Sequence, residues 1–261
     1  MFSFQQVFVN MPFLAKFENS GIQLRKIFET IYAKDRIEDG FFVVTEDRLT
    51  MQTMDDAHVA MCDLTIMKTI AKIWKCDAKY SIGVSFETLL KVLKVAPSNS
   101  ICSLKYDPDN GDTLQVQYHV GDSKKLKSSF KIKLIPFDNE QFEIPADHLP
   151  VEKQTVESAE FSRNLASIAA FSDELVMKLC HSSIHFASTG DFADADMELS
   201  VKSSTVKDEV EERFSIPYLQ WVTKAGGMFA EFTIGYKSPA LCFEFMNDKM
   251  QLRFFLAAKV A

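Results

Sequence analysis

The chain has 261 residues, enough for one large domain or two domains of ordinary size, and its 47% apolar and 25% charged residues are typical of a globular protein. Its formal net charge of −7 excludes a protein coated in positive charge, but leaves positive charge confined to one face open. The five cysteines are odd in number and form no C-x-x-C pair, which argues against a disulfide scaffold or a zinc site and for a reducing compartment. No apolar run is long enough for a membrane span and the start of the chain lacks a basic segment, so we expect neither a membrane protein nor a signal peptide.

The first half of the chain is predicted to form two amphipathic helices, each followed by strands. Apolar residues in the first helix follow the i, i+3, i+4, i+7 spacing, and the second helix has a comparable apolar face. These faces consist of Leu24, Ile27, Phe28 and Ile31, and of Phe86, Leu89, Leu90 and Leu93. Strands are predicted at residues 41–45, 49–54, 58–66, 101–106, 113–120 and 130–134.

The second half repeats this order. One helix is predicted around Phe161, Leu165 and Ile168, and another begins near Ser215 as N-cap, with Pro217 in its first turn. Strands are predicted at residues 174–179, 184–188, 197–201, 231–236, 241–246 and 251–256. Four residues, Ser85, Leu89, Val92 and Lys94, recur 130 positions later as Ser215, Leu219, Val222 and Lys224. The repeated order indicates an α+β protein that arose by internal duplication.

The segment between the halves has a distinct composition. Acidic and apolar residues lie between Pro136 and Pro145, which fits either an extended connector or an ordinary surface loop. We therefore predict an N-terminal domain at residues 1–132, a connector at 133–147 and a C-terminal domain at 148–261.

The sequence offers no arrangement typical of an enzyme. Its five histidines form no H-E-x-x-H or H-x-H pair, and no phosphate-binding loop or nucleophile-elbow motif is present. Cys180 and His181 are adjacent, but neighbouring residues on a strand point to opposite faces, which separates a nucleophile from its base. Asp194, Asp196 and Glu198 alternate, which fits a solvated strand edge better than a metal site. We therefore expect no catalysis, no cofactor and no metal.

The predicted helices carry positive charge, with little acid, away from their apolar faces. These cations are Arg25, Lys26, Lys91, Lys94, Arg163 and Lys224. Each such face alone fits an ordinary solvated surface. Four of them in a chain of net charge −7 indicate a basic surface separated from an acidic one. Such a surface supports contact with a phosphate backbone without reading of the bases.

Five segments, in order along the chain, resemble the proliferating cell nuclear antigen family of DNA sliding clamps. They are residues 49–61 (LTMQTMDDAHVAM), 133–145 (the connector), 186–191 (FASTGD), 218–225 (YLQWVTKA) and 252–260 (LRFFLAAKV). The resemblance extends from about residue 13 to the end of the chain with few gaps. It implies an α+β fold with two similar clamp domains per chain. It further implies a head-to-tail homotrimer closed into a ring, with helices lining the hole and antiparallel sheets outside.

The resemblance implies a processivity factor for a replicative DNA polymerase. The ring would encircle duplex DNA without sequence preference and would dock replication and repair proteins in the nucleus. A separate clamp-loading ATPase would open the ring, since the chain lacks a nucleotide-binding loop. The DNA-facing residues would be Arg25, Lys26, Lys91, Lys94, Lys133, Arg163 and Lys224.

Two further sites follow from the resemblance. Subunits would join where residues 125–134 of one chain pair antiparallel with residues 196–203 of the next, with Lys127, Phe130, Lys131, Asp196 and Glu198 at the contact. Short partner peptides with aromatic and aliphatic anchors would bind an apolar pocket beneath the connector. Its residues would be Met54, His58, Val59, Met61, Phe142, Ile144, Pro145, Pro239, Phe255, Leu256 and Ala257.

Several departures mark a divergent member. About ten residues precede the family's usual start, residues 257–259 read Ala-Ala-Lys in place of Ala-Pro-Lys, and the acidic tail is absent. This divergence also fits a family member that is encoded by a virus and located at a viral replication site in the host cell. Two alternatives to the homotrimer stay open at this point: a subunit of a heterotrimeric checkpoint-type clamp, and a monomeric polymerase accessory factor that holds DNA by charge alone.

Overall fold

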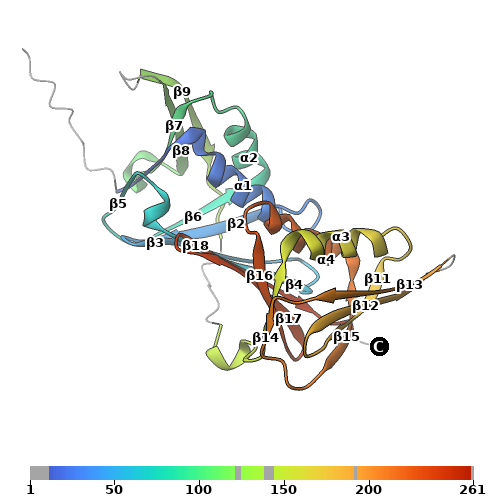
Figure 1. Ribbon diagram of the computed structural model, residues 1–261. Helices are drawn as coiled ribbons and strands as arrows, with labels where there is room; N and C mark the ends of the chain where they lie inside the picture. The colour runs from blue at the N-terminus through green and yellow to red at the C-terminus, as the bar shows by residue number, and fades with distance from the viewer. Residues whose placement is uncertain (1–11, 121–124, 138–143, 191–192, 260–261) are drawn as a thin grey trace, which may run out of the picture. The chain divides into compact units, whose positions relative to one another are not determined.

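The computed structural model describes residues 12–120, 125–137, 144–190 and 193–259, which divide into two compact units (Figure 1). Unit 1 comprises Met1–Glu29, Glu38–Met51 and Thr65–Asn139, and unit 2 comprises Thr30–Ile37, Gln52–Leu64 and Glu140–Ala261. Two segments from the first half of the chain thus belong to unit 2. The domain boundaries at residues 132 and 148 follow the sequence repeat and stay a prediction.

Unit 1 contains an antiparallel sheet with the strand order β5-β1-β7-β8-β9 and a second set of strands in which β6 pairs with β2 and β2 with β3. Its strands are β1 (Phe13–Phe17), β2 (Asp39–Val44), β5 (Ile73–Cys76), β6 (Tyr80–Ser85), β7 (Ser100–Tyr106), β8 (Thr113–Val120) and β9 (Lys125–Lys133). Strands β3 (Arg48–Met54) and β4 (Ala60–Met67) belong partly to each unit. The helices are α1 (Ile22–Ile31), most of which belongs to unit 1, α2 (Phe86–Lys94) and the short 3-10 helices η1 (Asn19–Gly21), η2 (Lys68–Ile70) and η3 (Pro108–Asn110).

The predicted apolar faces of α1 and α2 are buried in the core. The ring centroid of Phe28 on α1 lies 6.3 Å from that of Phe42 on β2 and 5.8 Å from that of Phe86 on α2. Ser85 begins α2 by accepting a hydrogen bond from the Thr88 amide at 3.4 Å, as an N-cap does. The 3.6-residue periodicity therefore placed both helices correctly.

Unit 2 contains two antiparallel sheets, with strand orders β14-β10-β16-β17-β18 and β13-β12-β11-β15. The strands are β10 (Gln154–Glu157), β11 (Glu174–Leu179), β12 (Ser183–Thr189), β13 (Asp194–Ser200), β14 (Ser203–Ser204), β15 (Val210–Ser215), β16 (Glu231–Lys237), β17 (Ala240–Asn247) and β18 (Met250–Ala257). The helices are α3 (Ser158–Ile168), α4 (Ile216–Thr223), η4 (Ala146–His148) and η5 (Lys224–Gly227).

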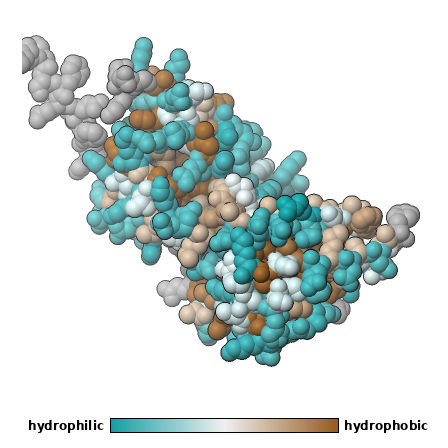
Figure 2. Space-filling view, in the orientation of Figure 1, coloured by the Kyte–Doolittle hydropathy of each residue, from teal (hydrophilic) through white to brown (hydrophobic). Residues whose placement is uncertain are grey.

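Aromatic packing forms the core of unit 2. The ring of Phe161 on α3 meets Phe186, Phe232 and Phe243 edge-on at centroid distances of 5.4, 5.2 and 6.0 Å. Helices α3 and α4 pack against each other (Figure 1). Hydrophilic side chains cover much of the visible face of each unit (Figure 2). No helix in the described part of the chain is long and apolar enough to cross a membrane.

The predicted α+β class with antiparallel sheets is confirmed, and two local predictions are wrong. Residues 196–203 are not one strand: β13 ends at Ser200, and Ser203–Ser204 form β14, which pairs with β10. The prediction that Ser215 is the N-cap of α4 is confirmed, although its side chain makes no capping hydrogen bond. Cys180 and His181 lie in the turn after β11 and not on a strand.

Candidate functional site

The cations predicted on the helices of unit 1 lie outside the buried faces of α1 and α2. Lys26, Lys91 and Lys94 are exposed, whereas Arg25 is only partly exposed. The Lys91 ammonium lies 2.8 Å from a carboxylate oxygen of Glu87. The Glu29 carboxylate lies 3.7 Å from the Arg25 guanidinium and 4.0 Å from the Lys94 ammonium, so it joins the two helices.

The expectation of little acid beside these cations is therefore wrong. Glu29 follows Arg25 by four residues, and Glu87 precedes Lys91 by four residues. This spacing brings two side chains together on the surface of a helix. In unit 2, Arg163 on α3 likewise lies 3.7 Å from Glu160, three residues earlier. Each cationic face thus keeps only part of its formal positive charge.

Two further cations of the predicted basic surface lie outside the α-helices. Lys224 begins η5, directly after α4, and its ammonium donates a hydrogen bond to the Tyr32 carbonyl at 3.3 Å. Burial, followed by repulsion from Arg36, lowers the pKa of Lys224. Lys133 is exposed at the end of β9. The local environments of these cations therefore differ widely.

The residues predicted to bind a partner peptide gather around one pocket of about 680 Å³, which lies entirely in unit 2. The predicted residues that line it are Met54, His58, Val59, Met61, Ile144, Pro145, Pro239, Phe255 and Ala257. Phe142 lies outside the described residues. Sequence reasoning missed Ala60, Asp147, His148, Lys237, Ser238 and Ala240, which also line the pocket. Most of them lie within three residues of Pro145 or Pro239 in the sequence, which could have predicted that they line the pocket.

The prediction that Leu256 lines this pocket is wrong. Strand β18 alternates, so that Phe254 and Leu256 are buried in the core while Phe255 and Ala257 lie on the pocket side. The strand's two-residue periodicity was the signal that could have excluded Leu256. The pocket therefore combines an apolar surface, to which Met54 and Phe255 contribute, with polar residues that include Asp147 and Lys237.

Two strands at sheet edges carry charge of opposite sign. Among the described residues β9 pairs with β8 alone, and β13 pairs with β12 alone. Strand β9 carries Lys125, Lys127, Lys131 and Lys133 and no acidic residue, and all four lysines are exposed. Strand β13 carries Asp194, Asp196 and Glu198, all exposed, and no basic residue.

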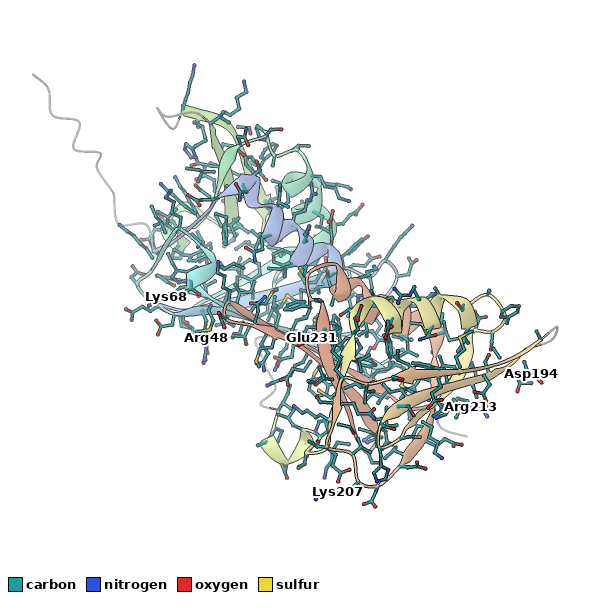
Figure 3. The ribbon with its side chains drawn as sticks, in the orientation of Figure 1. Arg48, Lys68, Asp194, Lys207, Arg213 and Glu231 are labelled. Carbon is teal, nitrogen blue, oxygen red and sulfur yellow. The ribbon has the colours of Figure 1, made fainter. Side chains whose placement is uncertain are left out.

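The environments of the two edges differ in detail. The register of β9 shifts opposite Tyr118 and His119, which places a bulge at Lys127. Phe130 is half-buried, with its ring 6.3 Å from that of Tyr118 in the same chain. Beside β13 a pocket of about 510 Å³ is lined by residues that include Asp194 and Arg213 (Figure 3).

The surroundings of Cys180 disfavour a reactive thiolate. Burial, followed by a hydrogen bond and charge repulsion from Glu209, raises the pKa of the Cys180 thiol, which disfavours the nucleophilic thiolate. Within residues 12–120, 125–137, 144–190 and 193–259, no group of three or more His, Cys, Asp or Glu side chains could hold a metal ion.

Comparison with known proteins gives matches along most of the chain. Residues 12–141 match the sequence model described as proliferating cell nuclear antigen, N-terminal domain, and residues 153–260 match its C-terminal domain. A Caenorhabditis elegans protein named proliferating cell nuclear antigen is 29% identical over 261 residues, covering 95% of this chain and 97% of that protein. The two domain matches follow each other in chain order.

Proposed function

Because the chain belongs to the proliferating cell nuclear antigen family of sliding clamps, we propose that three copies close into a ring around duplex DNA. The ring serves as a processivity factor for a replicative polymerase and docks replication and repair proteins in the nucleus. Clamps of this family are non-catalytic scaffolds, so the function lies in binding and topology. A clamp-loading ATPase opens the ring.

The observation that carries the ring is the pair of edge strands with opposite charge. An unpaired strand edge presents free backbone donors and acceptors, and a second strand can add to it. The lysines of β9 and the acids of β13 are complementary in charge. Because the two edges belong to different strands of one chain, their contact is head-to-tail, and such contacts close into a ring when the rotation is right. The shorter β13, which ends at Ser200, limits the antiparallel addition to its own seven residues.

The helix cations supply contact with the phosphate backbone. Lys91, Lys94 and Arg163 are each accompanied by a carboxylate within 4.0 Å, which weakens their attraction for phosphate. Weak contacts without base reading let a protein move along DNA. A closed ring does not need tight contacts, because its topology keeps it on the duplex.

The 680 Å³ pocket accepts the short peptides of partner proteins. Met54 is 40% exposed and Phe255 is partly exposed on the pocket side, so an aromatic or aliphatic anchor can cover both. Methionine adapts its shape to different apolar groups, which suits a site shared by several partners.

Native mass by light scattering across a dilution series tests the ring. We expect a mass near three times the 29.6 kDa of one chain. In a second assay the protein threads onto linear duplex DNA with free ends, and the ends are then blocked with streptavidin. A ring stays on blocked DNA and leaves DNA whose ends remain free.

Other outcomes identify the alternatives. A monomer at every concentration overturns the homotrimer and favours a subunit of a heterotrimeric clamp. A monomer retained equally on blocked and free-ended DNA, with steep salt dependence, is instead an accessory factor that binds by charge.

A further inference from the structure

One wall of the partner pocket is the turn between β3 and β4. His58 and Val59 of this turn line the pocket, together with Met54 at the end of β3 and Ala60 at the start of β4. The turn is closed by hydrogen bonds from the Asp55 amide to the Ala60 carbonyl at 3.0 Å and from the His58 amide to the Asp55 carbonyl at 2.9 Å. His58 has a φ of +56°, a left-handed conformation that a residue with a side chain adopts only when its surroundings hold it there.

The carboxylate of Asp55 organises this turn. One oxygen, Oδ1, accepts hydrogen bonds from the amides of Val59 at 2.8 Å and Ala60 at 2.7 Å. Asp55 is only 2% exposed, so these charge-assisted bonds form away from solvent. The position of the pocket wall therefore depends on where this carboxylate is held.

The second carboxylate oxygen is held by a residue from another part of unit 2. The hydroxyl of Tyr218, on α4, donates a hydrogen bond to Asp55 Oδ2 at 2.5 Å. Burial and this bond raise the pKa of Tyr218 to about 12, so its hydroxyl keeps its proton at neutral pH. Tyr218 does not itself line the pocket.

The ring of Tyr218 is in turn fixed in place. The Arg36 guanidinium lies 4.5 Å above the ring centroid, a cation–π contact, and donates a 3.5 Å hydrogen bond to the Pro217 carbonyl. A series of contacts therefore connects α4 to the pocket wall. It runs from Arg36 through Tyr218 and Asp55 to the turn, and all of these contacts lie within unit 2.

We propose that Tyr218 is a positioning residue for the partner pocket, because its hydroxyl holds the Asp55 carboxylate that shapes the turn forming the pocket wall. This inference rests on the proposed function of the pocket. It assigns a role in partner binding to α4, which directly precedes the candidate DNA contact Lys224.

The variant Tyr218→Phe tests this role, because it removes one oxygen and keeps the ring under Arg36. We expect hydrogen exchange of the Val59 and Ala60 amides to accelerate while amides of β16 and β17 stay unchanged. The dissociation constant of a fluorescent peptide with the family's aromatic and aliphatic anchors should rise roughly tenfold, as expected for loss of one hydrogen bond to a charged group.

The matched control is Tyr80→Phe. The Tyr80 hydroxyl also donates to an aspartate, Asp77, at 2.5 Å, but it belongs to unit 1 and does not line the pocket. This variant should change neither the exchange of the turn nor peptide affinity.

Three outcomes overturn the inference: peptide affinity of Tyr218→Phe equal to wild type, weaker affinity without faster exchange of the turn, or an equal loss in Tyr80→Phe. A wild-type protein that fails to bind the peptide at all contradicts the proposed partner site instead, which distinguishes the two failures.

Discussion

Replacing Phe255 by alanine should weaken partner binding far more than it weakens the fold. Phe255 lies on the pocket side of β18, whereas its neighbour Phe254 is fully buried with its ring 4.9 Å from that of Trp221. Truncation of Phe254 should destabilise the protein by about 3–5 kcal/mol, as in other cores. Phe255 is partly exposed and lies on the opposite face of β18, so its truncation leaves the packing of Phe254 intact.

The magnitude follows from the surface that a bound anchor covers. Losing about 100 Å² of apolar contact at about 25 cal/mol per Å² costs about 2.5 kcal/mol, or about 70-fold in the dissociation constant. Fluorescence anisotropy with the labelled partner peptide measures this change, and thermal denaturation measures the fold.

The control is Phe171→Ala, because Phe171 is 50% exposed in the same unit but does not line the pocket. It should bind the peptide as the wild type does. Unchanged affinity of Phe255→Ala, with a melting temperature near that of wild type, would refute the assignment of this pocket to partner peptides.

The remaining predictions concern DNA, the ring and acid stability. Replacing the exposed Lys91 and Lys94 by alanine should lower the salt slope of DNA binding by about 1 for each lysine that contacts a phosphate, without changing the melting temperature; an unchanged slope excludes them from the DNA contact. Lys131→Glu should shift the native mass toward the monomer, because it places a negative charge opposite the acidic residues of β13 in the neighbouring subunit. Adding Asp196→Lys should restore the ring. A trimer that persists in Lys131→Glu argues against this interface. Burial alone would raise the pKa of Glu244, but hydrogen bonds from neighbouring cations outweigh it and lower the pKa. Stability from this carboxylate is therefore present above its ordinary pKa of 4.5 and is lost as the pH falls below it, so Glu244→Gln should flatten the acid limb of the melting temperature; equal acid limbs would contradict this.

Periodicity was sufficient to predict most helices and the longer strands. The apolar face of α2 and the alternation of β8 are local patterns, because one side of each element is buried and the other is not. Six strands escaped prediction: β1, β5, β6, β10, β14 and β15. In β5 and β15 most residues are half-buried or exposed, so neither has a buried face that periodicity could reveal. Strand β5 pairs with β1 and β15 with β11 through backbone hydrogen bonds. Such bonds do not depend on the sequence of side chains, so the sequence does not reveal them.

The candidate site shows the same division. Resemblance located the pocket because Met54, Pro145 and Phe255 occur in segments that are recognisable one by one. The pairing of cations with Glu29 and Glu87 is also predictable from the sequence, because residues four apart lie on the same face of a helix. The contact of Tyr218 with Asp55 was not readable, because 163 positions separate the two residues.

The sequence by itself determined the family, the α+β class and the absence of recognisable catalytic motifs, since these depend on residue identity and on short-range periodicity. The tertiary structure alone decided that residues 30–37 and 52–64 belong with the second unit and that Asp55 meets Tyr218. The physical reason is that long-range contacts form where separate apolar faces and buried polar groups find partners in space. Distance along the chain does not specify those partners.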